Sequence, residues 1–152
     1  MLVHSRGEVN KTNTLWVNGG SGAFRKSIWE DLGGFDELYN PFYWEDIDLS
    51  YRAKKAGYKI IYVPTAKVYH KVSQSFSGWI NPVVLYYSTR NELLLARKHL
   101  NFSLFMPLWI PRFVLRIVHY LIATRNVKLA RFMLRGFLDF TRGKFGRTLF
   151  EV

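Results

Sequence analysis

Hydrophobic and polar residues alternate in short blocks through the first hundred positions, and glycines and prolines separate the blocks. Apolar residues at helical spacing predict two short helices, each closed by glycine, and a longer third helix. Asn81 and Pro82 mark the start of the long helix, because asparagine caps helix N-termini and proline suits the first helical position. The predicted helices are 24–32, 45–56 and 81–100, and the predicted strands are 58–63 and 66–71.

The last third of the chain has a different pattern. Residues 102–123 are strongly apolar, but two prolines and the charged or polar residues Arg112, Arg116 and His119 interrupt them. A membrane-spanning helix needs roughly 20 apolar residues with few charges, so we do not expect a simple span here. Residues 127–142 predict an amphipathic helix, because one face is polar and the rest is apolar. The polar face consists of Lys128, Arg131, Arg135, Asp139 and Arg142.

The composition of the chain excludes several kinds of site and indicates the charge of a partner. The chain has 152 residues, enough for one domain with a core, and it contains no cysteine, which excludes disulfides, thiolate metal sites and cysteine nucleophiles. Its formal net charge of +11 points to an anionic partner. Residues 1–89 contribute only +2, whereas residues 90–152 contribute +9. The N-terminal segment lacks the pattern of a signal peptide.

An acidic centre lies at the start of the second predicted helix. Helical spacing places Asp46 on the apolar face of this helix. The neighbouring face carries Glu45 and Asp48, which we expect to pair as surface ions with Arg52 and Lys55. A carboxylate on the first helical turn, beside an aromatic loop, suits a general base that deprotonates a hydroxyl. The alternative is that Asp46 only caps the helix while Glu45 and Asp48 are solvated.

Two further features are ambiguous by themselves. His70 ends the second predicted strand, where it could bind a metal or a phosphate, or serve as a hydrogen-bonded structural histidine. The glycine loop, residues 18–22, could let a sugar or a phosphate approach the backbone, or it could be a plain turn.

The order of these segments resembles the second half of the catalytic domain of family-two glycosyltransferases. These are inverting enzymes of the GT-A fold, and the closest resemblance is to the rhamnosyltransferase-like group. The resemblance covers about residues 17–95. It is carried by Gly20-Ser21-Gly22-Ala23-Phe24-Arg25-Lys26, Gly33-Gly34-Phe35-Asp36-Glu37, Trp44-Glu45-Asp46-Ile47-Asp48-Leu49, Arg52, Gly57-Tyr58, Tyr62-Val63-Pro64, Val68-Tyr69-His70, Tyr86-Tyr87 and Arg90-Asn91.

The resemblance implies a fold and a set of residue roles. The fold would be α/β, the C-terminal half of a Rossmann-like GT-A domain over residues 1–100, followed by amphipathic helices over 101–152. Asp46 of the Glu45-Asp46 pair would be the catalytic base for sugar transfer from a nucleotide-sugar to a glycan or lipid-linked acceptor, in polysaccharide biosynthesis of the cell envelope. His70 would lie near the donor diphosphate and its Mg²⁺ or Mn²⁺. The acceptor side would include Gly20, Ser21, Gly22 and Trp44.

One part of the family pattern is missing. The family carries donor binding and a metal-binding Asp-x-Asp motif in the preceding half of the domain, whereas the only Asp-x-Asp here is Asp46-Ile47-Asp48 of the base motif. We therefore expect a C-terminal piece, which could be a gene fragment, a truncated reading frame or one part of a split enzyme with a separate N-terminal half. We expect that it neither binds a nucleotide-sugar tightly nor turns it over alone. The alternative is a non-catalytic membrane-surface or assembly module derived from such an enzyme.

The basic C-terminal part allows three interpretations. We favour a peripheral element that lies on anionic lipid at the cytoplasmic face of the membrane, with apolar faces in the headgroup region. A helical extension with a solvated basic face is the second interpretation. Nucleic-acid binding is the third, and we do not expect it because the apolar content exceeds what a solvated nucleic-acid helix needs.

Overall fold

The computed structural model describes residues 12–69 and 80–148. The chain divides into two compact units, the first formed by residues 1–36 and 45–74 and the second by residues 37–44 and 75–152. The boundary that we predicted after residue 100 falls inside the second unit. The predicted polar loop over 72–78 lies outside the described residues.

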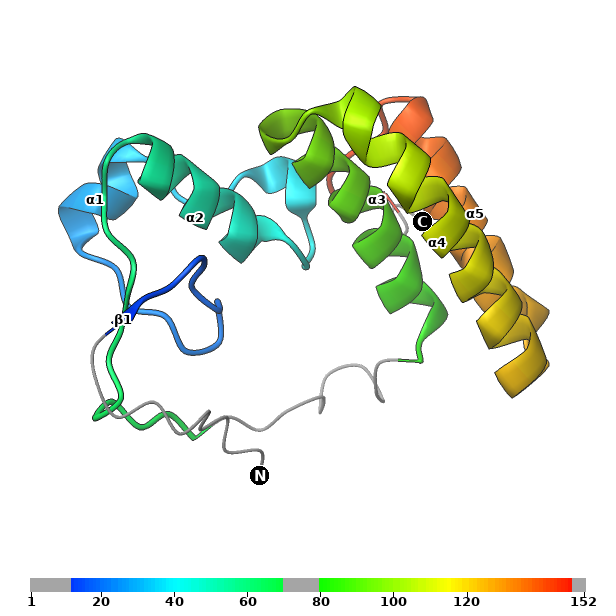
Figure 1. The fold of residues 1–152 in the computed structure, drawn as a ribbon, viewed down its shortest axis with the longest axis horizontal. Helices are drawn as coiled ribbons and strands as arrows, with labels where there is room; N and C mark the ends of the chain where they lie inside the picture. The colour runs from blue at the N-terminus through cyan, green and yellow to red at the C-terminus, as the bar shows by residue number, and fades with distance from the viewer. Residues whose placement is uncertain (1–11, 70–79, 149–152) are drawn as a thin grey trace. The chain divides into compact units, whose positions relative to one another are not determined.

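In the first unit, two helices accompany a minimal antiparallel sheet (Figure 1). The strands β1 (Thr12–Asn13) and β2 (Ile61–Tyr62) pair in the register Thr12 with Tyr62. The helices are α1 (Lys26–Asp31) and α2 (Glu45–Lys55). Both helices were predicted, although α1 is shorter than expected. The glycine stop of α1 is confirmed by backbone hydrogen bonds from Gly33 to Glu30 and from Gly34 to Trp29.

The strand content is lower than we predicted. Of the strand expected over 58–63, only β2 forms, and residues 66–69 of the second expected strand are not a strand, while its remaining residues lie outside the described part. A turn bond from the Ala66 N–H to the Val63 carbonyl redirects the chain after Pro64, and Val68 and Tyr69 are exposed. The α/β fold that we predicted is therefore not confirmed in residues 12–69 and 80–148.

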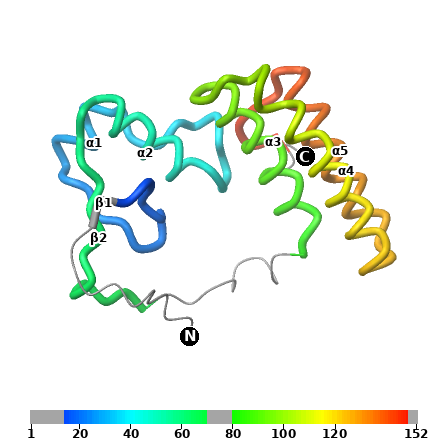
Figure 2. Tube along the Cα trace, viewed as in Figure 1, coloured from blue at the N-terminus to red at the C-terminus, as the bar shows by residue number. Residues whose placement is uncertain are grey.

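In the second unit, three helices lie side by side, and a short 3₁₀ helix precedes them (Figures 1 and 2). The helices are α3 (Pro82–His99), α4 (Phe102–Thr124) and α5 (Val127–Thr141), and the 3₁₀ turn is Glu37–Tyr39. The Asn81 side chain accepts a hydrogen bond from the Val83 N–H, 2.8 Å away, and Pro82 is the first helical residue, so both predicted start signals of α3 are confirmed.

Helix α5 packs against both α3 and α4. Leu93 of α3 and Leu129 and Met133 of α5 are buried in this core. Trp109 of α4, Phe113 of α4 and Phe137 of α5 form a cluster of stacked rings, with centroid distances from Trp109 of 4.5 Å to Phe113 and 6.0 Å to Phe137. Burying an apolar side chain of this size stabilises a fold by roughly 1.5–3 kcal/mol, so this core holds the three helices together.

The predicted polar face of α5 is only partly solvent-exposed. Lys128, Arg131, Arg135 and Arg142 are exposed, but Asp139 is buried. The Tyr86 hydroxyl on α3 donates a hydrogen bond to Asp139 Oδ2 over 2.8 Å. Asp139 belongs to the predicted polar face but is not solvated, because a partner on another helix satisfies its carboxylate.

A close approach between α3 and α5 depends on Gly136. A Cβ atom at this position would lie 2.5 Å from the backbone oxygen of Tyr86, closer than real Cβ contacts allow. We expect Gly136→Ala to lower the free energy of unfolding by about 1–3 kcal/mol, because the two helices must separate. Urea denaturation followed by circular dichroism measures the change. The control Leu134→Ala alters an exposed residue of the same helix, and equal stability of the two variants would contradict the prediction.

Helix α4 is long and apolar enough to cross a membrane, by length and composition alone. Only Trp109 and Phe113 of its residues are buried. The helix contains Pro107 and Pro111 as well as two arginines, as the sequence shows. The exposed face of α4 is therefore apolar and contains positive charge.

Candidate active site

Asp46 lies on the first turn of α2, where the backbone holds both oxygens of its carboxylate. The Gly19 N–H donates to Asp46 Oδ2 over 2.9 Å, and the Ile47 N–H donates to Oδ1 over 2.8 Å. Two hydrogen bonds to a carboxylate fix its orientation. The structure thus brings the predicted base into contact with the glycine loop, 27 residues earlier in the chain.

The glycine loop (residues 18–22) is a compact turn whose backbone is open to solvent. The Asn18 side chain accepts from the Gly20 N–H over 2.8 Å, and the Asn18 carbonyl accepts from the Ser21 N–H over 3.1 Å. A Cβ atom on Gly22 would lie 2.1 Å from a methyl carbon of Val17, so the turn needs glycine there. Gly20 and Ser21 are exposed beside Asp46, where a ligand could reach them. Acceptor binding by this loop stays a prediction.

A serine of α2 fastens the loop to the helix. The Ser50 hydroxyl accepts a hydrogen bond from the Val17 N–H over 3.0 Å and donates to the Asp46 carbonyl over 2.7 Å. Ser50 itself is buried. This serine therefore positions the glycine loop next to Asp46 without contributing an ionisable group.

Glu45, the other predicted catalytic residue, has a different environment. Its Oε2 atom is buried and has no hydrogen-bond partner in the described part of the chain. Burial raises the pKa of the Glu45 carboxyl above its ordinary value, and the charge of Asp46 adds to this, although a backbone hydrogen bond opposes it. The two adjacent carboxyl groups are therefore unequal, because Glu45 has a buried unpaired oxygen whereas both oxygens of Asp46 accept from backbone N–H groups.

Asp48 is not the solvated acid that we considered. It is fully buried, and the Arg52 Nε atom donates to its Oδ2 atom over 2.8 Å. Arg52 also donates to the carbonyls of Leu32 and Gly34, at the end of α1. The predicted Asp48–Arg52 pair exists, but it is an internal pair that joins α1 to α2. The helical pattern could not show this, because the burying residues come from another segment.

Trp44 ends a loop with unusual backbone geometry. Tyr43 and Trp44 have φ angles of 74° and 76°, which are rare for residues with side chains. The Trp44 indole N–H donates to the Ser88 carbonyl over 3.1 Å, so α3 holds the ring. The predicted acceptor role of Trp44 remains a prediction.

Two neighbouring residues of α3 organise this loop. The side-chain amide of Asn91 donates to the carbonyls of Tyr39, Phe42 and Tyr43 over 2.8–3.0 Å. Arg90, also buried, donates to the Leu38 and Asn40 carbonyls. These two side chains therefore determine the course of the segment that leads directly into Glu45 and Asp46.

The positioning roles of Arg90 and Asn91 were not predicted from the sequence, although both belong to the matching motifs. An available signal was an arginine followed by an asparagine among apolar residues in the middle of a helix. Buried polar side chains in such a place need several partners. Their partners are backbone carbonyls about 50 positions earlier in the chain, which no local pattern reveals.

The predicted metal site cannot be placed. His70 lies outside the described residues. Residues 12–69 and 80–148 contain no group of three or more histidine, aspartate or glutamate side chains that could hold a metal ion. Mg²⁺ or Mn²⁺ therefore remains an implication of the resemblance.

Comparison with known proteins identifies the family. A sequence profile of glycosyl transferase family group 2 matches residues 4–138. The N-acetylglucosaminyl-diphospho-decaprenol L-rhamnosyltransferases of two Mycobacterium tuberculosis strains are each 43% identical to the chain over 60 residues. That stretch is 40% of this chain and 19% of each relative, so the match spans about a fifth of their length. No solved structure matches the chain significantly. Because the family profile covers well over half of the residues, the chain belongs to the family-two glycosyltransferases.

Proposed function

We propose that this chain supplies the acceptor and base side of an inverting glycosyltransferase that uses a nucleotide-sugar donor. The observation that carries the proposal is the Asp46 carboxylate, held at 2.9 Å by the Gly19 N–H next to an exposed glycine loop. A carboxylate in a fixed orientation beside an open backbone turn suits deprotonation of a bound hydroxyl.

In the proposed reaction, residues of the first unit promote one nucleophilic displacement at the donor sugar. Asp46 takes the proton from an acceptor hydroxyl while that oxygen attacks the anomeric carbon of the donor sugar. The bond to the nucleoside diphosphate breaks, and the configuration at the anomeric carbon inverts. The exposed backbone of Gly20 and Ser21 orients the acceptor next to Asp46. The resemblance also assigns Trp44, which precedes Glu45 in the chain, to the acceptor side.

We propose that a separate part of the enzyme binds the nucleotide-sugar donor. The GT-A fold of the family provides nucleotide binding and its Asp-x-Asp motif in the preceding half of the domain, and this chain carries no such motif outside the base motif. His70 and a divalent ion would lie near the donor diphosphate, where such an ion neutralises charge on the leaving group. The described residues do not form that site.

The names of the relatives suggest a substrate class. They are L-rhamnosyltransferases that act on N-acetylglucosaminyl-diphospho-decaprenol. We infer that the acceptor here is also a sugar on a lipid diphosphate, and that the donor is a nucleotide-activated deoxysugar such as rhamnose. A lipid-linked acceptor requires the enzyme to work at a membrane surface.

The exposed side chains of the second unit support a location at a membrane surface. Helix α4 exposes large apolar side chains, and the neighbouring helix α5 exposes Lys128, Arg131 and Arg135. Apolar residues beside lysine and arginine are complementary to an anionic lipid surface. We propose that the chain lies peripherally on the cytoplasmic face of the membrane. The charges within α4 favour this over a span.

A transfer assay tests the function. The chain is produced together with the region encoded immediately upstream of it, and transfer from a nucleotide-activated rhamnose to N-acetylglucosaminyl-diphospho-polyprenol is measured. We expect transfer by the combined protein and none by the chain alone. If the upstream region binds the nucleotide-sugar but the combined protein transfers none of a panel of donor sugars, the chain is a non-catalytic membrane-surface or assembly module instead.

A further inference from the structure

The residues that follow α5 bind back to α3, and we call residues 143–148 the anchor segment. Helix α5 ends at a glycine in the left-handed conformation, because Gly143 has a φ of 68° and its N–H donates to the Phe140 carbonyl over 3.1 Å. The next N–H, of Lys144, donates to the Asp139 carbonyl over 2.8 Å. These two bonds form a Schellman motif, which ends the helix and gives the anchor segment a defined direction.

An aromatic side chain holds the beginning of the anchor segment. The Phe145 ring lies edge-on to the Phe140 ring of α5, with centroids 6.2 Å apart. The Arg97 guanidinium of α3 lies 5.0 Å from the Phe140 centroid and 5.3 Å from the Phe145 centroid. A cation near two aromatic rings attracts both of them. The anchor segment is therefore held to α3 and α5 before it reaches Gly146.

Gly146 connects the anchor segment to the loop that precedes α2 (residues 37–44). Its N–H donates to the Leu38 carbonyl over 3.0 Å, and its carbonyl accepts from Arg90 Nη1 over 2.7 Å. Its φ of 75° is one that residues with side chains rarely adopt. The other terminal nitrogen of Arg90, Nη2, donates to the Leu38 and Asn40 carbonyls. One buried guanidinium therefore joins the anchor segment to the loop.

Thr148 extends this network with its hydroxyl group. Thr148 Oγ1 accepts from Arg90 Nη1 over 3.2 Å and lies 2.6 Å from the Tyr86 hydroxyl oxygen. Since the single hydroxyl proton of Tyr86 is donated to Asp139, the Thr148 hydroxyl is the donor to Tyr86. Tyr86 and Arg90 are both fully buried. The Thr148 hydroxyl is thus an acceptor and a donor at once, and a valine of the same shape could form neither bond.

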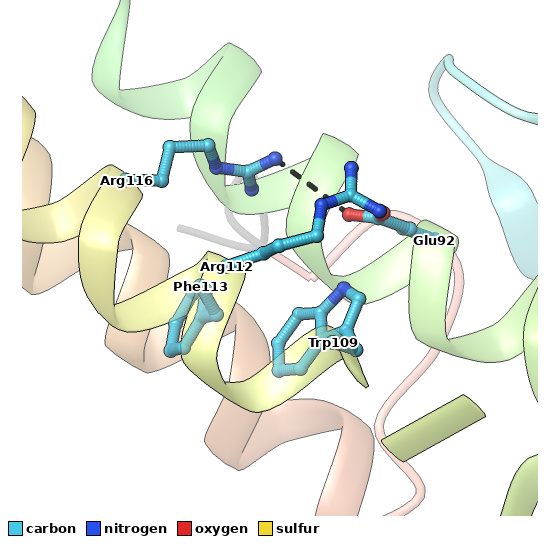
Figure 3. Close-up of a pocket in the computed structure, with 5 residues that line it drawn as sticks. All are labelled: Glu92, Trp109, Arg112, Phe113 and Arg116. Carbon is cyan, nitrogen blue, oxygen red and sulfur yellow. Dashed lines mark ion pairs between the residues drawn. The ribbon is translucent and has the colours of Figure 1, made fainter. Parts of the chain in front are cut away.

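Helix α3, which carries Arg90, is itself fixed against α4. The Arg116 side chain of α4 donates to the Thr89 hydroxyl over 3.0 Å. Its Nη1 atom lies 3.7 Å from Glu92 Oε2, the ion pair drawn in Figure 3. The residues on both sides of Arg90 therefore hold α3 in place, so the loop is bound both by a fixed helix and by the anchor segment.

We propose that the anchor segment positions the candidate base, with Thr148 as a positioning residue for the sugar-transfer reaction. The loop continues directly into Glu45 and Asp46, and its last two residues have the positive φ angles given above. Such backbone persists only where surrounding contacts hold it. A small displacement of a base lowers the rate strongly, because the reacting atoms must stay aligned. The proposal rests on the proposed function and deepens it.

Kinetics of the combined protein from the transfer assay test this role. Thr148→Val keeps the shape of the side chain and removes its hydroxyl. The matched control is Thr141→Val, the same change at an exposed threonine whose hydroxyl donates to the Leu138 carbonyl of its own helix. Gly146→Ala is a second test variant, because a side chain disfavours the backbone conformation that reaches Leu38. Circular dichroism verifies that the variants are folded to the same extent.

We expect Thr148→Val and Gly146→Ala each to lower kcat about tenfold, because the base loses its alignment. KM for the acceptor should change less than about twofold, since the glycine loop is not altered. Thr148→Ser restores the hydroxyl and should keep at least about half of the unaltered kcat. Thr141→Val should have the kcat of the unaltered protein.

Amide hydrogen exchange gives a readout that does not depend on activity. In the chain alone, we expect Thr148→Val to speed exchange about tenfold in residues 37–44 and to leave exchange in α4 unchanged. A loss of global stability would instead speed exchange in both places, and this result would overturn the positioning role.

Two other results would also overturn the positioning role and leave the proposed function intact. One is an unchanged kcat in both Thr148→Val and Gly146→Ala. The other is an unchanged rate of exchange in residues 37–44. Absence of transfer by the unaltered combined protein would overturn the proposed function, and the role of Thr148 with it. The failure of the role and the failure of the function are therefore distinguishable.

Discussion

Asp46→Asn in the complete enzyme should lower kcat by about 10²–10⁴-fold, the usual contribution of a general base. The amide cannot accept a proton from the acceptor hydroxyl, so the attacking oxygen must lose its proton without help. KM for the acceptor should change far less, because the glycine loop remains. Steady-state kinetics with saturating donor measure both parameters.

The substitution also has a structural effect that needs a control. Both Asp46 oxygens accept backbone hydrogen bonds, from Gly19 and Ile47, and an asparagine offers only one acceptor oxygen. Ser50→Ala is the matched control, because Ser50 ties the same loop to α2 but has no role in proton transfer. We expect Ser50→Ala to lower kcat by less than about tenfold. Turnover at the unaltered level by Asp46→Asn would exclude Asp46 as the base.

The elements that the sequence predicted best have signals within a few residues. The start of α3 was predicted because the Asn81 cap and Pro82 act on the next turn of the same helix. The position of α2 followed from helical spacing and the glycine after it. The candidate base was found from the spacing of the acids and from the resemblance to a family, and the structure adds its contact with the glycine loop.

The features that the sequence did not predict depend on residues far apart in the chain. Asp48 and Asp139 have the pattern of surface acids, yet Arg52 and Tyr86 satisfy them in buried positions. Helical periodicity reports which face a residue occupies, but it does not report what covers that face. The strand predicted over 58–63 shortens to β2 and residues 66–69 form no strand for a related reason, since a strand persists only where a neighbour pairs with it. Only β1 and β2 find such a pair in the described residues.

Arg90→Met should destabilise the second unit by roughly 3–5 kcal/mol, a large share of the stability of a small domain. Arg90 is fully buried, and four protein carbonyl or hydroxyl oxygens accept from its terminal nitrogens. Its Nε atom donates to the Asn91 side chain over 2.9 Å, and its guanidinium lies 4.8 Å from the centre of the Tyr87 ring. Burial lowers the pKa of Arg90 below its ordinary value, because it removes hydration from the charged guanidinium.

Methionine fills most of the space of the arginine side chain, so the expected loss comes from the acceptors and not from a cavity. The carbonyls of Asn40 and Gly146 would lose their Arg90 donors, whereas the Leu38 carbonyl would keep the Gly146 N–H, and each buried group left unpaired costs about 1–3 kcal/mol. Urea denaturation of the full chain, followed by tryptophan fluorescence, measures the loss. Arg131→Met removes an exposed arginine of α5 and should change the stability by less than about 0.5 kcal/mol. If the two variants unfold at the same urea concentration, Arg90 does not hold the loop before Glu45, and the order of that loop must come from Asn91 and its own backbone.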